Sequence, residues 1–334
     1  MAGSYTSGSA SSFSDLLTAI TNLLATKGYA NAAGAAGTPL PSASRILSKG
    51  DIYIRLGYDN TPALFIYGGT GISGANLVNP STEYCKMASA AAAPIVFPVT
   101  YEIFYNDDPE EVYVVISYNG DKYQHLHWGK SDVPDIGASG LWFAASYQGS
   151  QSMSGAAGGT GDQSKMYMSA TRTGGTATNA GAGYVYPTPY AGISGGYFFI
   201  GDNWKCGSIY VGLEGSPAWR TQQNSSVVGR IRWQLQNGPL MQALPSYFNE
   251  SEVLLPIWIT MERASALYTP VAVMRHARQM RIDNVSPGDI ITYGTDQWKC
   301  FPLYAKNTVQ RDGANWTTGA YHSGTVGVAL QYRP

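Results

Sequence analysis

The first clear pattern of apolar and polar positions predicts a short amphipathic helix near the N-terminus. Ser12 or Ser14 can cap it, Asp15 lies in its first turn, and Gly28 suits its C-terminal end. Because so short a helix is marginal alone, its apolar side must pack against its own β domain or a neighbouring subunit. We therefore treat it as a candidate docking helix. Its apolar stripe consists of Leu16, Leu17, Ile20, Leu23 and Leu24.

Beyond residue 44 the pattern changes to the alternation that is typical of β-strands. In the segment 51–58, for example, Ile52, Ile54 and Leu56 fall on one face. Short runs rich in β-branched and aromatic residues recur along the rest of the chain. They predict strands at 51–58, 63–67, 95–105, 112–118, 122–128, 140–145, 196–200, 208–213, 227–235, 253–261 and 271–280.

Two hairpins can be read from their turns. The acidic segment 106–111 is predicted to be the polar tip between the strands at 95–105 and 112–118. A second hairpin starts after Pro287-Gly288-Asp289, where Gly294 allows a reversal with positive φ, and leads into a final strand near the C-terminus. The sequence therefore predicts a mainly β protein of one or two antiparallel sandwich- or barrel-like domains, with a single N-terminal helix and long glycine-rich loops.

Segments of low complexity suggest how the chain is divided. Residues 1–12 are rich in Gly and Ser and are expected to be flexible, and residues 30–44 are expected to form a linker or long loop. The stretch 149–183 contains almost only Gly, Ala, Ser and Thr, so it cannot bury enough surface to fold alone. We expect an N-terminal arm and helix at 1–30, a β domain at 31–148, a loop at 149–183 and a second β domain at 184–334.

Composition narrows the classes of partner. The 334 residues carry a net charge of −1, which argues against strong attraction to nucleic acid or an anionic membrane. The chain has 39 glycines and 24 tyrosines, a balance that suits a β protein with many turns. Its three cysteines are widely spaced and odd in number, which predicts thiols in a reducing compartment rather than a disulfide framework. Neither a signal peptide nor an apolar run of membrane-spanning length is visible, so we expect synthesis in a cytoplasm and no membrane insertion.

Two short motifs resemble catalytic or cofactor-binding signatures but lack the required context. Gly69-x-Gly71-x-x-Gly74 has the dinucleotide spacing, yet the following residues 75–80 include a proline and show no helical stripe. Ser194 lies in a Gly-x-Ser-x-Gly sequence that leads into a predicted strand rather than a helix. We interpret both as glycine-rich loops, and we predict no catalytic residue and no cofactor.

The sequence signals for a metal site are also weak. His125 and His127 would point to one face of a strand, but no third ligand is evident near them. The acidic cluster at 107–111 does not have the spacing of a calcium loop and is expected to be a solvated hairpin tip. We therefore predict no metal site and expect that the protein is not an enzyme.

The basic run at 275–281 is the one concentration of positive charge. On a strand, Arg275 and Arg281 share a face that Arg278 does not, so a single stripe for phosphates is not expected. Salt bridges between subunits are the preferred interpretation, and binding to DNA in a neck channel is a minor alternative. Candidate interface residues are Trp298, Phe301, Tyr304, Arg275 and Arg278.

The segment 287–302, with the sequence Arg311-Asp312-Gly313 and the residues 322–330, resembles the C-terminal end of a family of virion structural proteins of tailed bacteriophages. Further segments with this resemblance are 12–20, 47–53, 97–101, 110–115, 140–143, 254–257 and 275–278. The resemblance implies a virion component without catalytic residues, in a multi-copy assembly with itself and other virion proteins. The resemblance does not fix the position in the particle; we expect the tail or baseplate, with the collar or neck as alternatives.

Two other functions compete with this interpretation. A host-recognition module could bind surface carbohydrate by stacking exposed tryptophans on sugar rings, although tryptophan is usually buried. The tryptophans considered are Trp128, Trp142, Trp219 and Trp316. An envelope-degrading hydrolase would need paired carboxylates or an activated nucleophile, which the sequence does not show.

Overall fold

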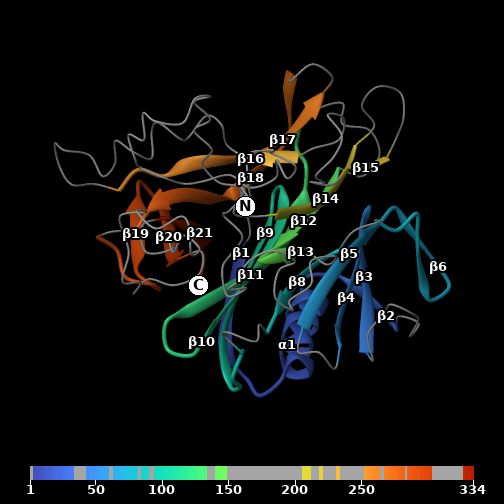
Figure 1. The fold of residues 1–334 in the computed structure, drawn as a ribbon, viewed down its shortest axis with the longest axis horizontal. Helices are drawn as coiled ribbons and strands as arrows, with labels where there is room; N and C mark the ends of the chain where they lie inside the picture. Colours follow the sequence, from blue (N-terminus) through green and yellow to red (C-terminus); the bar gives the residue numbers. More distant parts are fainter. Residues whose placement is uncertain are drawn as a thin grey trace, which may run out of the picture.

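The computed structural model describes residues 3–33, 43–59, 63–81, 84–89, 94–133, 140–148, 205–211, 218–220, 231–233, 252–263, 267–282, 284–302 and 326–334. Over these residues the protein is mainly β, as the sequence predicts, with one helix and antiparallel strand pairing throughout. The strands form three large sheets, which we name the central, second and third sheets, and one small hairpin (Figure 1).

The central sheet has seven strands, and its order joins distant parts of the chain. Its first strand comes from the N-terminus and its last two come from beyond residue 200. In spatial order they are β1 (Gly3–Ala10), β9 (Val99–Asp107), β10 (Glu110–Tyr118), β11 (Lys122–Lys130), β12 (Leu141–Ala145), β14 (Lys205–Val211) and β15 (Ala218–Arg220).

The second and third sheets have six strands each. The second sheet contains, in spatial order, β13 (Tyr147–Gln148), β8 (Cys85–Ala88), β5 (Ala63–Gly69), β4 (Ile52–Asp59), β3 (Ala43–Lys49) and β2 (Ala30–Ala33). The third contains β16 (Ile231–Trp233), β17 (Leu255–Arg263), β18 (Leu267–Arg281), β21 (Val326–Tyr332), β20 (Asp296–Pro302) and β19 (Ile290–Tyr293). Strands β6 (Gly71–Ser73) and β7 (Asn76–Val78) pair with each other.

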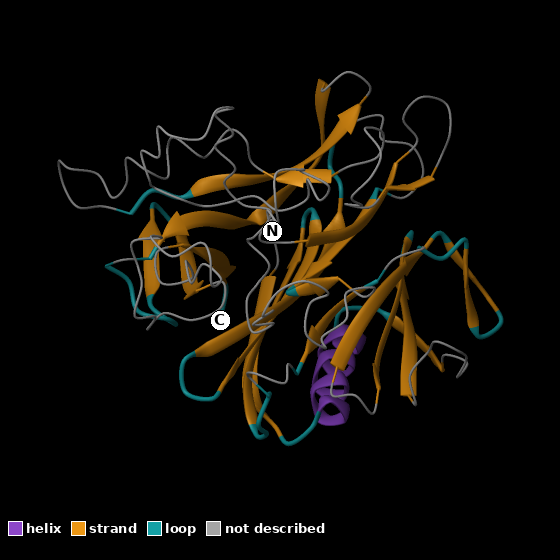
Figure 2. Cartoon of the chain, viewed as in Figure 1, coloured by secondary structure: helices purple, strands orange, loops and turns teal. Residues whose placement is uncertain are grey.

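The single helix α1 (Phe13–Thr26) begins and ends as its sequence predicts. Ser12, rather than Ser14, is the N-cap, and its hydroxyl accepts a hydrogen bond from the Asp15 N–H at 3.1 Å. At the other end Gly28 has φ +86, and the N–H of Tyr29 bonds to the carbonyl of Leu24. These bonds satisfy terminal backbone groups of the helix in a glycine-containing C-terminal motif. The helix lies between the central and second sheets (Figure 2).

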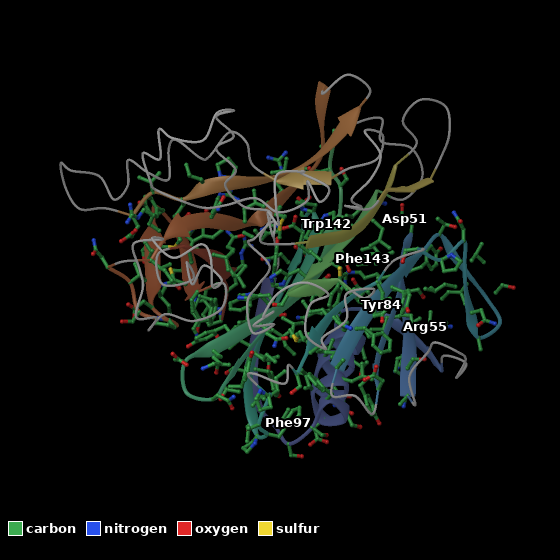
Figure 3. All side chains as sticks on the ribbon, in the orientation of Figure 1. Asp51, Arg55, Tyr84, Phe97, Trp142 and Phe143 are labelled. Carbon is green, nitrogen blue, oxygen red and sulfur yellow. The ribbon has the colours of Figure 1, made fainter. Side chains whose placement is uncertain are left out.

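The central sheet is buried on both faces. Trp142 and Phe143 are adjacent on β12, so their side chains point to opposite faces, and both are fully buried (Figure 3). One face packs on the helix and second sheet, where Gln124 bonds to the backbone of Ala88. The other face packs on the third sheet, where Phe104 contacts Phe301 with ring centroids 5.9 Å apart. One hydrophobic core therefore extends from the helix to the third sheet.

The structure corrects two expectations about the N-terminal part of the chain. Residues 1–12 were expected to be flexible, but Gly3–Ala10 pairs with β9 over its whole length. Backbone pairing, which does not depend on apolar side chains, makes this Gly/Ser segment a strand. Residues 30–44 were expected to be a linker, but β2 starts at Ala30 and β3 at Ala43.

The expected domain boundaries also do not separate the sheets. The central sheet takes strands from 1–30, from 31–148 and from 184–334. Its strand pairing therefore crosses the predicted boundaries at residues 30 and 184. The glycine-rich stretch 149–183 and the predicted strand at 196–200 lie outside the described residues.

Candidate functional site

The two faces of the central sheet differ in polarity. The face toward the second sheet is built from apolar residues such as Val114, Leu126 and Trp128. The face toward the third sheet carries buried or half-buried polar groups at neighbouring register positions. We call the contact between this face and the third sheet the inter-sheet interface. Its polar residues on the central sheet include Glu102, Asn106, Glu111, His125 and His127.

Glu111 is the most unusual charged group at this interface. It has no exposed surface, and its carboxylate accepts hydrogen bonds from the backbone N–H groups of Arg275 at 2.9 Å and His276 at 2.8 Å, both on β18. The hydroxyl of Tyr113 donates a third bond at 2.6 Å. Burial raises the pKa of Glu111 to about 7, although these three bonds favour the ionised form and lower it. One carboxylate thus links β10 directly to the backbone of the third sheet.

This location overturns part of the prediction for the acidic cluster. The turn is only Asp108-Pro109, so Glu110 and Glu111 are already in β10. Glu110 forms an ion pair with Lys49 at 2.8 Å, and Glu111 is covered by the third sheet. The expectation of a solvated tip was therefore wrong for Glu111.

His125 and His127 point to one face, as the strand alternation predicts. Their ring centroids are 5.5 Å apart, and neither residue is exposed. The Nε2–H of His125 donates to the carbonyl oxygen of Pro302 on β20, at 3.0 Å. Burial lowers the pKa of His125 to about 4, and burial together with the neighbouring His125 lowers the pKa of His127 well below its ordinary value. Both rings are therefore neutral in the assembled structure at neutral pH.

A third histidine lies at the same interface. His276 on β18 places Nε2 3.0 Å from the carbonyl oxygen of Asp108 and Nδ1 near the amide oxygen of Gln331. Burial lowers its pKa, and these hydrogen bonds partly offset that effect. Three of the four histidines of the chain are thus gathered between the central and third sheets.

The residues predicted as an intermolecular interface are largely used within the chain. Trp298 and Phe301 are buried, at 5% and 2% exposure, so they are not available on the surface of the chain. Arg278 covers the Trp298 ring, with its guanidinium carbon 4.8 Å from the ring centroid. Arg275 forms an ion pair with Asp132 in the same chain, and its predicted bridge to another subunit stays a prediction. Tyr304 lies outside the described residues.

The stripe of the candidate docking helix is also internal. Leu16, Ile20 and Leu24 have no exposed surface, and Leu17 is 5% exposed. Leu23 is half-buried and packs at the margin of the same core. Of the two alternatives drawn from the sequence, the stripe therefore packs on its own β domain. Docking to another protein through these side chains would require the helix to leave the core.

The remaining motifs can be compared with the structure where it describes them. Gly69 ends β5 and Gly74, with φ +59, forms the turn between β6 and β7, so a hairpin follows the glycines instead of a nucleotide-binding helix. Ser194 lies outside the described residues.

Two of the tryptophans proposed to bind carbohydrate are not on the surface. Trp128 and Trp142 are completely buried, so they cannot stack on a sugar. The side chains of Trp219 and Trp316 lie outside the described part of the structure.

The cysteines that can be described, Cys85 and Cys300, are buried, and burial raises the pKa of Cys300 to about 12.

Exposed apolar side chains identify a different surface. Of the four large apolar residues that are exposed in the described part of the chain, two lie on β19: Ile290 at 45% and Tyr293 at 42%. Strand β19 pairs with β20 on one side and is last in the order of the third sheet. The turn residues predict this hairpin, but they do not mark Ile290 or Tyr293 as interface residues. An exposed apolar pair at the end of a sheet is a signal that could have identified them.

Comparisons with known proteins do not assign the chain. No protein-family model matches it, and no curated protein matches it. Within the described ranges, no cluster of three or more His, Cys, Asp or Glu residues could hold a metal ion. Nor does the described part of the chain include a helix long and apolar enough to span a membrane.

Proposed function

We propose that this chain is a structural component of a tailed-bacteriophage virion. It acts in several copies, through contacts with itself and with other virion proteins, in the tail or baseplate. The proposal rests on the resemblance described above, which includes the segment 287–302. The collar or neck is the alternative position within the same particle.

The structural observation that supports an assembly role is the hairpin formed by β19 and β20. It belongs to one of the segments with the resemblance, and it carries Ile290 and Tyr293 exposed on a strand at the end of its sheet. A strand in this position can pair with a strand of another chain through its backbone, while its exposed side chains add apolar contact area. The buried charged groups, by contrast, are engaged in holding the sheets together.

The test is incorporation into particles. Phage carrying the double substitution Ile290→Lys and Tyr293→Lys should contain much less of this chain, measured by quantitative mass spectrometry of purified virions. The matched control is the double substitution Val78→Lys and Val96→Lys, which introduces the same charge at two apolar residues that are 41% and 59% exposed. Thermal unfolding of the purified variants would show that each remains folded.

Cryo-electron microscopy of the intact particle provides the second measurement. Density for the chain in the tail or baseplate would support the proposal, and density in the collar or neck would select the alternative. Absence of the chain from purified particles would overturn the virion role. Normal incorporation of the variant with Ile290→Lys and Tyr293→Lys would overturn the contact through β19.

A further inference from the structure

The inter-sheet interface is a joint between two sheets in which buried polar groups lie among the residues of the hydrophobic core. Its central-sheet side includes Glu111, His125 and His127, all without exposed surface. Burying such groups is costly unless hydrogen bonds or opposite charges compensate them. The opposite face of the same sheet, toward the helix and second sheet, is mostly apolar. Separation at the polar face would rehydrate groups that prefer water, which offsets part of the cost of exposing apolar residues such as Phe104 and Phe301.

The histidine pair makes this joint sensitive to protons. His125 holds the third sheet by donating from Nε2 to the Pro302 carbonyl, which requires only the neutral ring. His127 lies beside it and packs against Tyr113, with ring centroids 4.9 Å apart. Protonating both rings would place two positive charges with their centroids only 5.5 Å apart in a site closed to water.

The charged and titratable groups around His125 and His127 are not placed to neutralise positive charge on the two rings. Glu111 and Tyr113 bond to each other on β10, and Lys299 on β20 is paired with Glu102 on β9. On β18, Arg278 lies near Tyr113 and Glu111, and His276 lies beside the Asp108 carbonyl. Tyr123 on β11 packs against Phe301. The nearby carboxylates are thus already engaged by other donors.

We infer that the third sheet is released from the central sheet on acidification, with protonation of His125 and His127 driving release and protonation of Glu111 opposing it. Protonation of Glu111 has the opposite effect on release, because the neutral carboxyl group is favoured in the buried site. A proton on the carboxyl oxygen next to Tyr113 can be donated to the Tyr113 hydroxyl, which is able to accept.

The direction of each effect follows from whether the group binds its proton more tightly in the closed form or in the open form. A histidine with a lowered pKa in the closed joint takes up a proton on release, so release becomes easier as pH falls below 6.5. At pH 5 a histidine that stays neutral in the closed form and has its ordinary pKa of 6.5 in the open form favours the open form by about thirtyfold; this applies to His125, with a closed pKa of about 4, and to His127, whose closed pKa is well below 6.5. Glu111, with a pKa of about 7 when closed and an ordinary value of 4.5, opposes by about 75-fold. The net effect is on the order of tenfold or more, since His276 acts in the same direction as the pair.

Hydrogen–deuterium exchange of the intact chain, read by mass spectrometry and corrected for intrinsic exchange rates, tests this inference. Between pH 7.5 and pH 5, the protection of β18, β20 and β21 should fall about tenfold or more, while α1, β4 and β5 keep theirs. An unchanged third sheet would overturn the inference. A loss shared equally by all these elements would also overturn it, because it would indicate global unfolding.

Two sets of variants test whether His125, His127 and Glu111 are the groups that cause the pH response. In His125→Gln with His127→Gln the acid-induced loss should disappear or reverse, because only Glu111 and His276 remain. In Glu111→Gln the loss should steepen to about a thousandfold. If the double variant does not fold, His125→Gln alone should shift the pH response by about thirtyfold toward protection, which is enough to abolish the acid-induced loss. An unchanged pH response in the foldable histidine variant, or in Glu111→Gln, would contradict the inference.

Discussion

The hydroxyl of Tyr5, in the first strand, accepts a hydrogen bond at 3.0 Å from the ammonium group of Lys299, in a strand near the C-terminus. The same hydroxyl donates to Glu102 at 2.9 Å, and Glu102 pairs with Lys299 at 2.5 Å. The Tyr5 ring also packs edge-on against Tyr332. The N-terminal segment is thus part of the inter-sheet interface, and four strands, β1, β9, β20 and β21, meet at one tyrosine.

Removing that hydroxyl should weaken the interface. Tyr5→Phe is expected to lower the free energy of unfolding by about 1–2 kcal/mol, measured by urea denaturation, because Glu102 and Lys299 each lose a partner. Tyr332→Phe, which keeps the ring beside Tyr5, should change stability much less. Equal losses in the two variants would contradict this assignment.

The same contact has a predicted pH dependence. Burial alone lowers the pKa of Lys299, but hydrogen bonds to Glu102 and Tyr5 outweigh it and raise the pKa above 10.5. A raised lysine pKa stabilises the folded state below pH 10.5 and loses that contribution as pH rises through the folded value. The difference between wild type and Tyr5→Phe should therefore shrink at strongly alkaline pH.

Local chemistry was enough to predict much of the fold. Ser12, Asp15 and Gly28 determine the ends of the helix through contacts within a few residues, so the sequence shows them directly. The alternation at 51–58 and the turn glycine Gly294, with φ +60, are likewise local signals. These predictions agree with the structure.

The parts that could not be predicted depend on contacts between distant residues. Glu111 belongs to a strongly acidic stretch, and only the packing of β18, more than 150 residues later, distinguishes it from a solvated carboxylate. The Gly/Ser segment of β1 carries little side-chain signal because its order comes from pairing with β9. Trp298 and Arg278 have the residue types of an interface, but they stack on each other within the chain.

Core substitutions in the helix can separate internal packing from docking. Leu16→Ala should lower the free energy of unfolding by about 2–5 kcal/mol, because Leu16 is fully buried between two sheets. Leu23→Ala, the same change on the same helix at a half-buried position, should cost about 1 kcal/mol. Chemical denaturation measures both. An undiminished stability of Leu16→Ala, combined with poor incorporation into particles, would instead indicate that the stripe docks to another protein.

The last prediction concerns the site that accommodates Glu111. Gly129 on β11 lies opposite Glu111 in the strand register, and a Cβ added there would lie 2.7 Å from Cζ2 of Trp142 and 2.9 Å from Cγ of Glu111. Neither neighbour has exposed surface, so neither can turn outward to make room. We expect Gly129→Ala to destabilise the protein by about 1–3 kcal/mol in chemical denaturation.

A local readout and a matched control make this prediction specific. Displacing Glu111 should loosen its bonds to the backbone of Arg275 and His276, so those two amides should exchange faster in Gly129→Ala than in wild type. Gly71→Ala is the control, because the nearest atom to its added Cβ would be Cβ of Val78 at 3.5 Å, an ordinary contact. That variant should be neutral or slightly stabilised, since alanine restricts the unfolded chain. Equal stability of the two variants would show that the space beside Gly129 is not needed to hold Glu111 against the third sheet.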